Sequence, residues 1–227
     1  MTYPIQIIPS LKSYSLTLPI SEKGTDLPKV VQSLANYCDP AWFFVNTLKN
    51  CVVLNVNVDM CKGLGATTAN SVNLRSELRE LDINGKNASW NLSDQTLHIL
   101  ESTMSVDAYS GKGVVIAQCH GGVKKPNMEL RLIDGNFLVE NHQNKQGTKN
   151  VVVGILSQGY VIGTKFVIKI VAGNSKIDVY FNGSKKISFA SKFPNQFFKI
   201  GAYDQSGIKP GSISTVSLYN LSTTTQK

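Results

Sequence analysis

Residues 165–181 read KFVIKIVAGNSKIDVYF, and this stretch indicates the fold class clearly. Two runs rich in Val, Ile, Phe and Tyr flank the turn dipeptide Gly173-Asn174, which is the pattern of two antiparallel strands joined by a tight turn. Similar runs recur at residues 51–59, 113–120, 128–133, 195–203 and 212–221. Roughly ten or more strands of this kind in one chain predict an all-β fold, a sandwich or jelly roll of two antiparallel sheets.

One stretch departs from this pattern. Residues 26–36 place Leu27, Val30, Val31 and Leu34 at helical spacing, so we expect a helix there. No internal repeat, low-complexity segment or linker interrupts the chain. This continuity predicts a single domain over residues 1–227.

Composition excludes several classes of protein. The chain has 227 residues, of which 42% are hydrophobic and 17% charged, so it is long and apolar enough to bury a core and is not a disordered chain. No stretch approaches the roughly 18–20 apolar residues of a membrane-spanning helix. The N-terminal residues have no basic region followed by an apolar block, so we see no signal peptide in this chain.

The positive charge is unevenly distributed. The net charge is +8, and residues 1–100 contain eight basic and eight acidic side chains, so the whole excess lies in residues 101–227. Such an excess favours a polyanionic partner: nucleic acid, an anionic membrane surface or an acidic polysaccharide. A nucleic-acid binder is disfavoured because the chain has few arginines to interleave with exposed aromatic side chains.

The four cysteines, Cys38, Cys51, Cys61 and Cys119, are too few for a disulfide scaffold. Neither they nor the three histidines follow zinc-ligand spacing. A strand between Cys51 and Cys61 would extend roughly 33 Å, too far for these two to pair. If a disulfide exists, Cys38 pairs with Cys51 or with Cys61.

Three of the expected strands combine an apolar face with an unusually polar one. Residues i, i+2 and i+4 of a strand share a face, so the polar and apolar sets follow from sequence parity. If the three strands are neighbours, one sheet carries a cationic surface rich in hydrogen-bonding groups, which indicates a functional site. The polar faces consist of Arg75, Glu77 and Arg79; of Gln118 and His120; and of Lys199, Gly201, Tyr203 and Gln205.

At these positions the sequence resembles polysaccharide lyase family 7, the alginate lyases. The motifs Arg75-Ser-Glu-Leu-Arg79, Gln118-Cys-His120 and the segment FFKIGAYDQ at residues 197–205 are similar to the three signatures of that family, in the same order. The resemblance covers about residues 11–221. It implies a concanavalin-like jelly roll with a concave substrate groove. Three positions depart from the family pattern, and we expect none of them to touch the polar face: Cys119, Phe197 and Ile200.

The resemblance implies β-elimination at a uronate, with Arg75, Gln118, His120 and Tyr203 as the catalytic residues. Arg75 and Gln118 neutralise the uronate carboxylate, because a guanidinium can bind it through two N–H groups and an amide N–H can add a third. His120 acts as base or holds the carboxylate, and Tyr203 donates a proton to the leaving oxygen. In the family, Tyr can also be the base when the C5 proton lies on its side of the ring.

Further residues are expected to bind the polysaccharide: Arg79, Lys199, Gln205, Lys125 and Arg131. Loops at residues 62–71 and 141–150 should cover the groove, because both are rich in small and polar residues. Glu77 is expected to form a structural ion pair with Arg79, and His98 and His142 are expected to play no part in the site. We expect no cofactor and no metal, a monomer, and no nucleic-acid or membrane partner. The substrate class implies a secreted or extracellular protein.

Three functions remain open at this point. The first is an endo-acting alginate lyase that releases unsaturated oligouronates. The second is a lyase of the same fold acting on glucuronan or another polyuronate, because the motifs would serve any 4-linked uronate. The third is a carbohydrate-binding module without catalysis, which would need cations and aromatic side chains but no His–Tyr pair.

Overall fold

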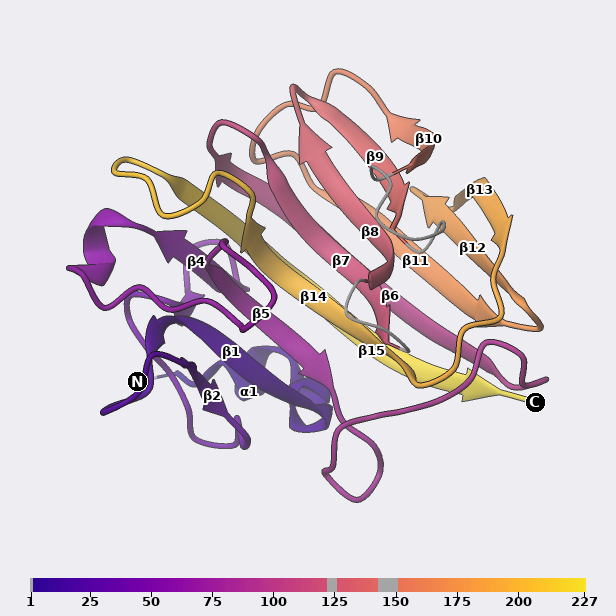
Figure 1. Ribbon diagram of the computed structural model, residues 1–227, viewed down its shortest axis with the longest axis horizontal. Helices are drawn as coiled ribbons and strands as arrows, with labels where there is room; N and C mark the ends of the chain where they lie inside the picture. Colours follow the sequence, from indigo (N-terminus) through magenta and orange to yellow (C-terminus); the bar gives the residue numbers. More distant parts are fainter. Residues whose placement is uncertain (1, 122–125, 143–150) are drawn as a thin grey trace.

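The computed structural model describes residues 2–121, 126–142 and 151–227. Across these residues the chain forms two antiparallel sheets stacked face to face, with very little helix (Figure 1). The predicted all-β class and two-sheet architecture are confirmed. The short helical segments are α1 (Pro4–Ile7) and the 3₁₀ turns η1 (Pro9–Ser13) and η2 (Asp59–Cys61).

The larger sheet has the strand order β10-β9-β8-β7-β14-β5-β1-β2. Strands distant in sequence are neighbours here: β14, near the C-terminus, lies between β7 and β5. The three strands with polar faces are therefore adjacent. The strands of this sheet are β1 (Tyr14–Ser21), β2 (Pro28–Val31), β5 (Arg75–Glu80), β7 (Val114–Gly121), β8 (Pro126–Ile133), β9 (Asn136–Asn141), β10 (Val151–Ser157) and β14 (Gln196–Asp204).

The smaller sheet has the order β13-β12-β11-β6-β15-β4-β3. Its hairpin β11–β12 is the one predicted from residues 165–181. Gly173 pairs with Lys176, and the two residues between them, Asn174 and Ser175, both have positive φ, as the tight turns of antiparallel hairpins require. The strands are β3 (Phe43–Asn46), β4 (Cys51–Asn57), β6 (Leu97–Tyr109), β11 (Phe166–Gly173), β12 (Lys176–Phe181), β13 (Ser184–Ala190) and β15 (Ile213–Gln226).

The hydrophobic core fills the space between the two sheets. Alternate residues of nearly every central strand point into it, as the period of two in the sequence requires. On β14, for example, Phe198, Ile200 and Ala202 are buried in the core, and Lys199 and Tyr203, which alternate with them, face outward. The outer face of the larger sheet is thereby free to carry the polar side chains.

The helix predicted for residues 26–36 is wrong. Residues 28–31 instead form β2, which pairs with the edge of β1. Leu27 and Val30 are 58% and 43% exposed, so the helical spacing does not produce a buried stripe. An isolated helix of this length is marginal in water, and the unpaired edge of β1 offers the backbone a better set of hydrogen bonds.

All four cysteines are free thiols, so the conditional disulfide of Cys38 is not formed. Cys119 is fully buried on β7, as its parity predicted, and burial raises the pKa of its thiol well above the ordinary value. A thiol held protonated in the core is not a nucleophile.

Candidate active site

The polar faces of β5, β14 and β7 form the floor of a groove on the outer side of the larger sheet. Its volume is about 400 Å³, and its lining includes side chains of β8 and of the segment that precedes β5. Residues that the sequence placed on three separate strands therefore meet at one site. The strand register pairs Arg75 with Tyr203, Arg79 with Lys199, Lys199 with Gln118, and Phe197 with His120.

Gly201 allows the central strand to carry this site. It has φ of 149°, and a Cβ built on it would approach the carbonyl oxygen of Ser76 to 2.5 Å, so a side chain there would push β14 away from β5. The pairing between β14 and β7 shifts at the same point, between Ile200 and Tyr203. The pairing of β14 with β5 continues without a shift from Lys199 to Tyr203, so Tyr203 keeps the same face as Lys199.

Glu77 is the electrostatic centre of the floor. Its side chain is 2% exposed, and its Oε2 lies 2.8 Å from Lys199 Nζ and 3.3 Å from Arg75 Nη1. Its Oε1 accepts a hydrogen bond from Gln118 Nε2. Burial alone would raise the pKa of Glu77, but Lys199, Arg75 and these hydrogen bonds together lower it, so the carboxylate stays charged. Glu77 is thus paired in the floor, but its partners are Lys199 and Arg75 and not Arg79, as the sequence had led us to expect.

Two cation–π contacts hold the arginines in place. The guanidinium carbon of Arg75 lies 3.8 Å from the ring centre of Tyr203, and that of Arg79 lies 3.6 Å from the ring centre of Phe197. Such contacts stabilise a cation while leaving its N–H groups free to bind an anion. Within the described residues, the buried Nε of each arginine has no hydrogen-bond acceptor.

Phe197 corrects one expectation from the sequence. It lies on the polar face, because its parity is that of Lys199 and Tyr203. Its ring stacks on the ring of His120, with centroids 5.3 Å apart, and it also contacts the guanidinium group of Arg79. The substitution of Phe for the family's Tyr at this position therefore does touch the site. It keeps the stacking surface and removes a hydroxyl.

His120 is held neutral. Burial, together with the positive charges of Lys199, Arg75 and Arg79, lowers its pKa from 6.5 to about 3, and Glu77 only partly opposes this. A neutral imidazole can accept a proton, so the electrostatics of the floor keep His120 in the protonation state of a base, and the same cations make it a weaker base than an ordinary imidazole.

This pKa makes a testable prediction. Between about pH 6.5 and pH 3 the unfolded chain protonates His120 but the folded chain does not, so this residue makes the folded state less stable as the pH falls. Wild type should lose up to ~1.4 kcal/mol per pH unit more than His120→Gln across this window. Urea unfolding near neutrality and at two acidic pH values measures this. If the free energy of unfolding falls equally with pH in the two proteins, His120 is not held neutral.

The sequence missed several lining residues. Ser71 Oγ lies 3.0 Å from the hydroxyl oxygen of Tyr203, and Thr68 and Asn70 line the same side of the groove. They come from the predicted loop at residues 62–71, so its position beside the groove agrees with the expectation, although the individual contacts could not be read from sequence. Of the second predicted loop, residues 143–150 lie outside the described part of the chain.

The remaining predicted binding residues are distributed unevenly. Lys199, Arg79 and Gln205 line the groove. Lys125 lies outside the described residues. Arg131 is not among the lining residues: its Nε donates to the carbonyl oxygen of Lys112 at 3.1 Å, and its Nη1 lies 3.4 Å from Glu140 Oε1.

His142 is not the bystander that the sequence suggested. It lines the groove together with Glu129 from β8, and its Nε2 lies 2.8 Å from Glu129 Oε2. Burial lowers the pKa of His142, but Glu129 and Glu140 outweigh it and raise the value to about 9. In the sequence, parity puts residues 140 and 142 on the same face of a strand. Parity alone cannot place Glu129 beside them, because that contact depends on the pairing of β8 with β9.

Several solved structures that superpose on this chain are alginate lyases. The alginate lyase AlgAT5 from polysaccharide lyase family 7 superposes with a TM-score of 0.86 and 27% identity over 100% of both chains. An alginate lyase from Corynebacterium sp. superposes with a TM-score of 0.84 and 27% identity over 99% of this chain and 98% of that one. Alginate lyase A1-II′, at 23% identity and a TM-score of 0.83 over 100% of both chains, shares the fold.

The jelly roll and its cationic groove thus define a polysaccharide lyase. The family model described as alginate lyase matches residues 10–225, and the chain belongs to that family. The resemblance seen in the three sequence motifs is confirmed. No curated protein sequence matches the chain. Among the described residues, no helix is long and apolar enough to cross a membrane.

Proposed function

We propose that this protein cleaves 4-linked polyuronates, alginate foremost, within the chain by β-elimination. The observation that carries the proposal is the direct pairing of Arg75 with Tyr203 on adjacent strands, beside a neutral His120. This arrangement supplies a fixed cation for the uronate carboxylate, a base and a proton donor on one groove floor.

The carboxylate of the sugar is neutralised first. Arg75 and Arg79 have Nε–H groups without acceptors among the described residues, and Gln118 Nε2 has a second hydrogen besides the one given to Glu77. Binding the carboxylate to Arg75 and Gln118 withdraws charge from the sugar and makes the proton on C5 more acidic. Lys199 and Arg79 bind neighbouring groups of the chain, and Gln205 lines the groove beside them.

Elimination then follows. A base removes the C5 proton, the electron pair left behind forms the C4–C5 double bond, and the bond from C4 to the glycosidic oxygen breaks. Tyr203 gives its proton to that oxygen. His120 is the base when the C5 proton lies on its side of the ring, and Tyr203 serves as base as well as acid when the proton lies on the other side.

The lining supports action within a long chain. The lining begins at the segment before β5, crosses β5, β14, β7 and β8, and ends at His142 just beyond β9. At the usual spacing between strands, the distance from β5 to β9 is about 19 Å. Such a length accommodates several sugar units. Variants of A1-II′ have been solved in complex with product (GGG) and with substrate (GGMG), which supports an oligosaccharide of this kind as the ligand here. A polymer of this size implies action outside the cell.

A panel of polyuronates tests the proposal. Alginate, polymannuronate, polyguluronate and glucuronan are each incubated with the protein, and the ultraviolet absorbance of the new double bond is recorded. We expect absorbance to rise with alginate and the viscosity of the polymer to fall early, as internal cleavage requires. Binding without any absorbance change on all four polymers would overturn the proposal in favour of a binding module.

We also expect turnover to survive a chelator. Each proton transfer and the neutralisation of the carboxylate are assigned to Arg75, Gln118, His120 and Tyr203, so no step uses a metal ion. Activity on alginate is measured before and after dialysis against EDTA. A loss of turnover that one divalent cation restores would contradict this assignment.

A further inference from the structure

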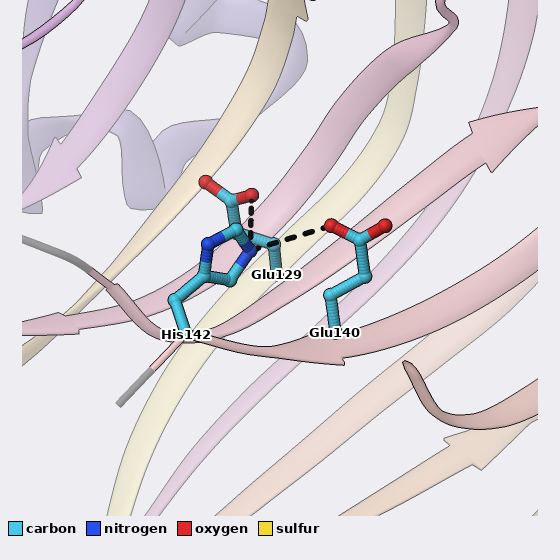
Figure 2. Close-up of side chains that lie close together, drawn as sticks. All are labelled: Glu129, Glu140 and His142. Atoms are coloured by element: carbon cyan, nitrogen blue, oxygen red, sulfur yellow. Dashed lines mark ion pairs between the residues drawn. The ribbon is translucent and has the colours of Figure 1, made fainter. Parts of the chain in front are cut away.

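A compact cluster of three ionisable side chains lies at one end of the groove (Figure 2). Glu129 on β8 and Glu140 on β9 are directly opposite each other in the strand register, and His142 follows two residues later on the same face as Glu140. The side chains of Glu129, Glu140 and His142 are only 8%, 7% and 9% exposed. They form a buried group rather than a solvated patch of surface charge.

The geometry at His142 is not that of an ordinary hydrogen bond. Nε2 lies 2.8 Å from Glu129 Oε2 and 3.3 Å from Glu140 Oε2. Within the described residues, however, this buried nitrogen has no hydrogen-bond partner of acceptable angle. Figure 2 shows Nε2 facing both carboxylates, with neither oxygen taken as its single partner. A donor that points between two acceptors is poorly placed for either of them.

The three side chains bring their ligand atoms close enough to share one ion. One ligand atom from each of the three residues lies within 4.8 Å of the others. Zinc binds imidazole nitrogen and carboxylate oxygen at about 2.0–2.2 Å, so neighbouring ligand atoms around a tetrahedral ion lie roughly 3.3–3.6 Å apart. The distance of 3.3 Å from Nε2 to Glu140 matches this separation, and the distance of 2.8 Å to Glu129 would lengthen slightly when an ion is bound.

Charge and access also suit a cation. Two buried carboxylates placed directly opposite each other in a sheet repel, and a protonated His142 supplies positive charge between them in the metal-free protein. A divalent cation would replace that proton at Nε2 and supply more positive charge at the same place. Arg131 Nη1, 3.4 Å from Glu140 Oε1, orients one carboxylate from outside the cluster, as groups behind metal ligands commonly do. Glu129 and His142 line the groove, which provides a path of entry.

We propose that Glu129, Glu140 and His142 form a binding site for a divalent transition metal of the zinc type, beside the catalytic floor and separate from its chemistry. The mixture of one imidazole and two carboxylates favours such an ion over calcium or magnesium, which prefer oxygen ligands alone. Three protein ligands leave at least one coordination position for water or for a group in the groove. Sequence spacing does not reveal the site because its ligands come from two strands.

Zinc titration tests the proposal without any substrate. The full chain, without an added histidine tag, is titrated with zinc chloride by calorimetry, as wild type, as His142→Gln and as Glu129→Gln. The control is His98→Gln, because His98 is an equally buried histidine that stacks on Trp90 away from the cluster. The cysteines are present in all four proteins, so any zinc they bind is common to them.

We expect one zinc ion to bind per chain in wild type and in the control. The zinc affinity should be weakened at least roughly 10–100-fold in both cluster variants. Identical titrations for wild type and His142→Gln would overturn the proposal. If a variant melts below the assay temperature, X-ray absorption of zinc-loaded wild type decides: one imidazole with oxygen ligands supports the site, and thiolate ligands refute it. Because no turnover is measured, these outcomes are independent of the proposed lyase activity.

Discussion

Replacing Tyr203 with phenylalanine is expected to lower turnover on polyuronate by about 10²–10⁴-fold, because general acid–base groups contribute that much to rate. The substitution removes only the hydroxyl that gives its proton to the glycosidic oxygen. The ring that packs under Arg75 is retained, and the hydroxyl's hydrogen-bond partner within the described residues is Ser71. The free energy of unfolding should therefore fall by only about 1 kcal/mol.

The measurement pairs product absorbance with polymer affinity for wild type and variant. Tyr180→Phe is the matched control, since Tyr180 lies on β12 of the other sheet and loses the same atom. Affinity should remain within a few-fold in both variants while turnover collapses in Tyr203→Phe alone. Turnover of Tyr203→Phe within a few-fold of wild type would remove this tyrosine from the mechanism.

Glu77→Gln is expected to have the largest effect on stability. The carboxylate is 2% exposed and lies between Lys199 and Arg75, so its neutral isostere leaves two cations in the floor without their counterion. Removing one partner of a buried ion pair costs about 3–5 kcal/mol. In a protein of this size such a loss should lower the melting temperature by roughly 10 °C.

Glu101→Gln provides the comparison. Glu101 also pairs with a lysine, Lys169, but at 3.8 Å and with both side chains about two-fifths exposed. A pair of that kind contributes at most about 1 kcal/mol, so the control should melt close to wild type. Denaturant unfolding of the three proteins gives the two differences directly. Equal losses in the free energy of unfolding for the two variants would show that burial of Glu77 does not add to the stability that its ion pairs provide.

Strand parity explains why the floor of the groove could be predicted from sequence. On a strand the side of each residue depends only on its number, so Tyr203 and Lys199 had to share a face once β14 was recognised. The three motifs and their resemblance to a family then supplied the neighbour relation among the strands. The long alternating runs, such as β11 and β12, likewise determined the fold class.

Contacts that depend on register or on loops could not be predicted. Glu129 and His142 meet only because β8 and β9 pair with Glu129 opposite Glu140, a one-residue choice that composition does not reveal. Ser71 reaches Tyr203 from an irregular segment. The false helix at residues 26–36 has the same origin, because the pairing of residues 28–31 with β1 outweighed a local pattern.

The mass of the alginate digestion products tests the central claim most directly. β-Elimination breaks the chain without adding water, so each cut should produce an oligomer that ends in an unsaturated sugar and is lighter by one water molecule than a hydrolytic product. Mass spectrometry of the wild-type digest should show this unsaturated series, and the Tyr203→Phe digest should lack it. A saturated series with the full mass of water added, or intact polymer with wild type, would contradict a lyase acting through this groove.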